Sequence, residues 1–106
     1  MSNILVCDDE KDIVVALKIY LSSDGHTVFE AYNGRQAIDI IHKNNIDLAL
    51  LDVMMPVTDG ITAVAEIRKF SNLPIILLTA KSEDTDKILG LNVGADDYVT
   101  KPFNPV

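Results

Sequence analysis

The chain has 106 residues, 48% of them hydrophobic, which suffices for one folded domain and excludes a disordered polypeptide. A formal net charge of −7 excludes the basic surface that a nucleic-acid backbone requires. The single cysteine, Cys7, excludes an internal disulfide; within an apolar run it is expected to be a small buried residue of a reducing compartment. No apolar stretch reaches membrane-spanning length and no signal-peptide pattern begins the chain, so we expect a cytoplasmic domain without membrane contact.

Apolar runs recur along the chain and do not alternate with polar residues: Ile4–Cys7, Leu48–Leu51 and Ile75–Leu78. Strands that are apolar on both faces are typical of parallel sheets covered by helices on each side. Two weaker runs, around Val28 and around Val99, predict two further strands. The chain is therefore expected to contain five strands.

Segments with helical spacing lie between these runs. The first has one apolar stripe, formed by Ile13, Leu17, Tyr20 and Leu21. Glu10 is expected where this helix starts, and Asn33, Asp59 and Ser82 are predicted to cap three later helices. Strict alternation of strand and helix predicts an α/β fold, a doubly wound parallel sheet with right-handed crossovers.

Polar residues follow or end four of the strands. In chain order they are Asp8, Asp9, Asp52, Thr79, Thr100 and Lys101. Ligands of open parallel sheets bind beyond the carboxyl ends of the strands, where the strand order reverses. We therefore expect these side chains to converge on one edge, whereas Asp96 and Asp97 are expected to form a solvated turn.

Four motifs match a known family: "DDE" at 8–10, "LLDVMMPVTDG" at 50–60, "LLTAK" at 77–81 and "GADDYVTKPF" at 94–103. With them the chain resembles, over its whole length, the CheY-like receiver domain of two-component response regulators. The segment "DDYVTKPFNP" is similar to the corresponding segment of receivers that precede a winged-helix DNA-binding domain, as in OmpR/PhoB-type regulators. The resemblance implies a flavodoxin-like sheet with strand order 2-1-3-4-5.

The resemblance also implies a metal site. Three carboxylates would lie within a few ångströms, and each like-charge pair at 4 Å costs about 4 kcal/mol at an effective dielectric near 20. Such oxygen ligands suit Mg²⁺, for which Mn²⁺ could substitute. In the family pattern Asp9, Asp52 and the backbone carbonyl of Met54 bind the metal, and Asp8 acts directly or through water.

By the same resemblance Asp52 is the phosphoacceptor, and a sensor histidine kinase supplies the phosphoryl group from a phosphohistidine. Lys101 would neutralise charge on that group. Thr79 would either donate to a phosphoryl oxygen or bond only to the backbone. Tyr98 is either half-buried packing or a rotameric switch that follows Thr79. The domain is expected to regulate, catalysing only its own phosphorylation and dephosphorylation, rather than to be an enzyme.

The last residues carry three further expectations. The Lys101–Pro102 peptide bond is a candidate for the cis form, as in the family. "FNPV" reads as a helix start with Asn104 at the N-cap, so the receiver domain is expected to occupy residues 1–106 and stop at the start of its fifth helix. Self-association would then involve the uncovered sheet face or the fourth helix with the fifth strand. DNA binding and transcriptional control would need an effector domain outside these residues.

Two rival functions use similar chemistry. A haloacid-dehalogenase-type phosphohydrolase also has an aspartate nucleophile and Mg²⁺, but it needs a second acid two residues later, where this chain has Met54. A flavin or nucleotide carrier needs small donor residues after the first strand, where Asp8, Asp9 and Glu10 would repel phosphate. Local chemistry disfavours both rivals.

Overall fold

The computed structural model describes residues 2–55, 57–80 and 94–101. The elements in this part alternate along the chain: β1 (Asn3–Cys7), α1 (Lys11–Ser23), β2 (Thr27–Ala31), α2 (Gly34–Lys43), β3 (Leu48–Asp52), α3 (Gly60–Arg68), β4 (Ile75–Ala80) and β5 (Asp97–Lys101). All neighbouring strands pair in parallel, in the order β2-β1-β3-β4-β5. The predicted fold class and strand order are confirmed.

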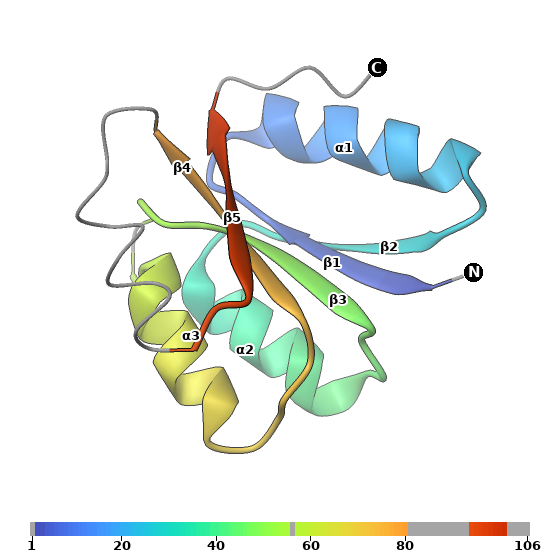
Figure 1. Ribbon diagram of the computed structural model, residues 1–106. Helices are drawn as coiled ribbons and strands as arrows, with labels where there is room; N and C mark the ends of the chain where they lie inside the picture. Colours follow the sequence, from blue (N-terminus) through green and yellow to red (C-terminus); the bar gives the residue numbers. More distant parts are fainter. Residues whose placement is uncertain (1, 56, 81–93, 102–106) are drawn as a thin grey trace.

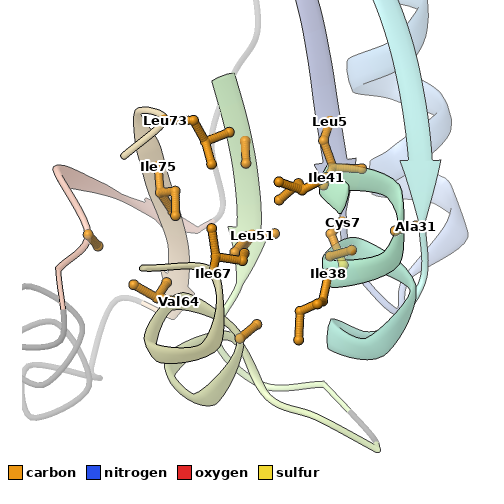
Figure 2. Packing of buried hydrophobic residues seen from close by; sticks show 14 of the residues in the cluster. Leu5, Cys7, Ala31, Ile38, Ile41, Leu51, Val64, Ile67, Leu73 and Ile75 are labelled. Carbon is orange, nitrogen blue, oxygen red and sulfur yellow. The ribbon is translucent and has the colours of Figure 1, made fainter. Parts of the chain in front are cut away.

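Helices cover both faces of the sheet, with α1 on one face and α2 and α3 on the other (Figure 1). Each interface has its own buried cluster. The smaller one lies under α1 and joins Val14 and Leu17 to Ile4, Val6 and Leu78. The larger one lies between the sheet and the other two helices, where Ile38 and Ile41 of α2 and Val64 and Ile67 of α3 pack (Figure 2). The non-alternating apolar strands therefore have the two-sided burial that their sequence predicts.

The predicted helix starts are confirmed where they are described. The Asn33 side chain accepts a hydrogen bond from the Gln36 amide (2.9 Å), and Asp59 accepts one from Thr62 (2.8 Å). Glu10 occupies the N-cap position of α1, although its side chain makes no capping bond. The predicted apolar stripe is wrong at Tyr20, which is 42% exposed because α1 buries its Val14–Leu17 side instead.

Asp96 is exposed, as expected, with 56% of its side chain accessible, but its carboxylate also has structural partners, whereas Asp97 begins β5 instead of lying in a turn. The Asp96 carboxylate accepts hydrogen bonds from the Arg68 guanidinium (3.0 Å) and from the Ile75 amide (2.8 Å). Arg68 also donates to the carbonyl oxygens of Gly94 and Leu73, at 2.9 and 2.8 Å. One guanidinium thus ties the end of α3 to the entry of both β4 and β5.

Three predictions lie outside the described residues: the helix capped by Ser82, the helix start at Asn104 and the cis Lys101–Pro102 bond. In the ranges that are described, no helix combines the length and the apolar character needed to cross a membrane.

Candidate functional site

Two strand ends bring the acidic residues together. Cys7 of β1 pairs with Leu51 of β3, so the next residues along these parallel strands, Asp8 and Asp52, lie side by side. Oxygen atoms of Asp8, Asp9 and Asp52 all lie within 4.8 Å of one another. Residues 44 positions apart in the chain therefore form one carboxylate cluster, which we call the acidic cluster.

The three carboxylates have different surroundings. Asp8 is fully buried, and its Oδ1 accepts a hydrogen bond from the Glu10 amide (3.0 Å). Asp52 is only 4% exposed, whereas Asp9 is exposed. At 4.8 Å two carboxylates repel by roughly 3.5 kcal/mol at an effective dielectric near 20. Two buried acids with a third at the solvent rim therefore favour a cation.

Thr79 lies on the strand next to Asp52. Asp52 pairs with Leu78 in the β3–β4 ladder, which puts Thr79 one residue further toward the carboxyl edge. Thr79 is 1% exposed and is one of three buried polar side chains in the described residues, the others being Asp8 and Asp52. The structure thus brings together the acidic cluster and the predicted threonine.

The β3–α3 loop follows directly after Asp52, and its residues 53–55 and 57–59 are described. The Val53 amide donates to the Leu78 carbonyl (3.0 Å), and the Val53 carbonyl accepts from Gly60 (2.9 Å). A Cβ on Gly60 would lie 2.9 Å from the Val53 Cα and closer still to the Asp52 carbonyl oxygen, so only glycine fits there. Met54 follows within the loop and its side chain is 64% exposed.

The β5 residues lie one strand further out. Thr100 pairs with Thr79, and Lys101 pairs with Ala80, so the Lys101 backbone reaches the same edge as the acidic cluster. The Lys101 side chain is outside the described part of the structure. Tyr98 pairs with Leu77 and is 37% exposed.

Cys7 is the buried neighbour of the cluster, as predicted. Burial, and then the negative charges of Asp8, Asp52 and Asp9, raise the pKa of its thiol to about 12. Its Sγ lies 3.3 Å from the Met55 Sδ and donates to the Asn33 carbonyl (3.3 Å). The sequence showed no sign of these contacts, because they join three separate segments of the chain.

The donor set fits a hard divalent cation. Three carboxylates offer oxygen only, with one of them exposed, and such a set suits Mg²⁺ or Mn²⁺ better than metals that prefer sulfur or nitrogen. The Cys7 thiol stays protonated below its raised pKa and does not compete as a ligand.

A doubly wound sheet with strand order 2-1-3-4-5 and carboxylates at the ends of β1 and β3 defines a flavodoxin-like domain with an acidic edge. The model of the response regulator receiver domain family matches residues 4–106. The chain belongs to this family and is the receiver domain of a two-component response regulator.

Similar proteins support this assignment. Regulatory protein VanRc of Enterococcus gallinarum is 52% identical and regulatory protein VanR of Enterococcus faecium is 48% identical; each match covers 97% of this chain and 45% of the relative. The chain therefore spans less than half the length of these curated relatives. A two-component response regulator from Clostridium difficile superposes with a TM-score of 0.93 at 36% identity, covering 98% of this chain and 86% of that one.

Proposed function

We propose that Asp52 accepts a phosphoryl group in a Mg²⁺-dependent reaction, with a phosphohistidine of a sensor histidine kinase as the donor. The observation that carries this proposal is the approach of the Asp8, Asp9 and Asp52 oxygen atoms to within 4.8 Å at the end of a buried strand. An aspartate that only ends a strand would not require two other carboxylates beside it. Three clustered carboxylates are suited to bind a cation, and this cation can also bind a phosphoryl group.

The residues have separate roles in the proposed reaction. A carboxylate oxygen of Asp52 attacks the phosphorus atom; the P–N bond to the donor imidazole breaks, and the imidazole nitrogen keeps the electron pair and takes up a proton. Asp8, Asp9, Asp52 and the Met54 carbonyl would hold Mg²⁺, which when bound neutralises charge on the phosphoryl oxygens. The Thr79 hydroxyl and the Lys101 ammonium would donate to these oxygens from the neighbouring strands.

The longer relatives support a proposal about what the phosphorylated domain controls. Proteins more than twice the length of this chain share its receiver, and we propose that the whole protein controls transcription through a DNA-binding effector domain. The receiver would catalyse only its own phosphorylation and dephosphorylation. The protonated thiol of buried Cys7 is compatible with the reducing cytoplasm as its compartment.

The test is Asp52→Asn. The variant should take up no hydroxylamine-labile phosphate from acetyl phosphate and Mg²⁺, as measured by intact mass. Its stability without Mg²⁺ should equal or exceed that of the wild type, because one of two adjacent buried charges is removed. Asp39→Asn, an exposed acid on α2, is the matched control and should be phosphorylated normally. If Asp52→Asn were labelled as readily as the control, the assignment would be wrong.

A further inference from the structure

The first residue of α2 is in close contact with the β3–α3 loop. The Gly34 amide donates a 2.9 Å hydrogen bond to the carbonyl oxygen of Thr58. A Cβ on Gly34 would lie 2.9 Å from the carbonyl carbon and from the Cβ of Thr58, and closer still to the carbonyl oxygen. Real Cβ atoms do not approach other atoms so closely, so residue 34 must be glycine for the loop to lie where it does.

A second set of contacts ties the same two segments to β1. Cys7 donates through Sγ to the carbonyl of Asn33, the residue that caps α2, and its sulfur lies 3.3 Å from that of Met55 in the loop. Cys7 directly precedes Asp8 of the acidic cluster. The α2 N-terminus, the β3–α3 loop and the start of the cluster therefore form one contiguous packed unit.

The loop itself is strained. Val57 has φ of +68°, a left-handed conformation that a β-branched residue adopts only at an energetic cost. Its side chain is 83% exposed, so buried packing of that side chain does not impose the conformation. The contacts that hold the loop lie instead on either side of Val57, at Met55 and Thr58.

We propose that the N-terminus of α2 holds the β3–α3 loop in its cation-binding position and that Gly34 is the residue that permits this. The atoms nearest to a Cβ on Gly34 all belong to Thr58, so Gly34 acts through the Thr58 carbonyl and is a positioning residue. This inference rests on the proposed Mg²⁺ function, because the loop carries the Met54 carbonyl and follows directly after Asp52. Loss of the contact at Thr58 releases the strain at Val57 and moves the Met54 carbonyl away from the carboxylates.

The experiment compares Mg²⁺ binding by the wild type, Gly34→Ala and Gly25→Ala, using isothermal titration calorimetry. Gly25 has φ of +87° in the turn between α1 and β2, so Gly25→Ala also introduces backbone strain, but away from the loop. Mg²⁺ affinity should fall roughly tenfold or more in Gly34→Ala, as for other residues that support metal ligands, and should stay within about twofold of wild type in Gly25→Ala. Equal affinities in the two folded variants would overturn the inference.

A measurement on the wild type decides the question if Gly34→Ala does not fold. By reciprocal coupling, Mg²⁺ should slow hydrogen exchange of the Gly34 amide more than that of Ala37, which bonds within the same helix to the Asn33 carbonyl. Equal slowing of both amides would overturn the positioning role. Failure of the wild type to bind Mg²⁺ at all would instead refute the proposed function, so the two failures are distinguishable.

Discussion

Asp9 differs from its two acidic neighbours because it is exposed, and its substitution leaves no buried group unpaired. Mg²⁺ at 100 times its Kd should stabilise the wild type by about 2.7 kcal/mol, since it binds the folded cluster and not the unfolded chain. Asp9→Ala should lose most of this effect in thermal melts with and without Mg²⁺. Asp12→Ala, an exposed acid in the first turn of α1, should keep it. Equal Mg²⁺ stabilisation of both variants would contradict the proposed metal site.

The Cys7 thiol should be inert in the folded protein. With a pKa of about 12, roughly one thiol in ten thousand is ionised at pH 8, and the sulfur is fully buried. Iodoacetamide at pH 8 should therefore label Cys7 in urea but not in buffer, with mass spectrometry as the readout. A cysteine introduced at exposed Ser23 in a Cys7→Ala background is the positive control. Labelling of native Cys7 at the rate of this control would show that the cluster edge opens readily.

The acids could be predicted from sequence because each follows an apolar run at a strand end, and parallel topology brings strand ends together. Gly34 could not be predicted in the same way. Its requirement for glycine arises from the Thr58 carbonyl, 24 residues away, and no local pattern encodes that approach. Met55 and Cys7 are a similar case, since their sulfurs meet only after β1 and β3 have paired.

At the scale of elements, Arg68 joins α3 to two strands and should contribute strongly to stability. Arg68→Met removes donors from the Gly94 and Leu73 carbonyls and leaves the Asp96 carboxylate without its cation. With the Arg68 side chain only 18% exposed, we expect a loss of about 2–3 kcal/mol in urea denaturation.

Two comparisons make the Arg68 prediction specific. Arg68→Lys should recover only part of the loss, because one ammonium cannot replace a planar fork that reaches four acceptors, the Ser71 carbonyl (3.3 Å) among them. Lys69→Met, at a side chain 71% exposed, should change stability by less than about 0.5 kcal/mol. If Arg68→Met matched Lys69→Met, the network at the entry to β4 and β5 would have no energetic importance.

Element boundaries were predictable where the signal is local. Asn33 and Asp59 cap their helices through amides three residues ahead, a contact that the sequence alone specifies. The exposure of Tyr20 and the partners of Asp96 could not be predicted, because both depend on tertiary packing. Tyr20 lies outside the Val14–Leu17 side that α1 buries, and the exposed Asp96 carboxylate binds Arg68, 28 residues away.

For the whole molecule, we predict that phosphorylation at Asp52 is transmitted across the sheet to β5. Thr79 would move toward the phosphoryl group, and Tyr98, which is half-exposed on the next strand, would turn inward to fill the space. Amide chemical shifts between residues 82 and 100 should then change on phosphorylation, and the change should be smaller in Thr79→Ala. Unchanged shifts across this range would refute the switch.

The strand order has a mechanical consequence. β1 and β3, which carry the acids, each pair with strands on both sides, so displacing either of them breaks two ladders of hydrogen bonds. β5 lies at the end of the sheet and pairs only with β4 within the described residues. An edge strand such as β5 can therefore shift with the loss of one ladder, whereas β1 and β3 cannot. Phosphorylation at the centre of the sheet would therefore displace an edge strand more easily than a central one, and β5 is the edge strand that pairs with the strand of Thr79.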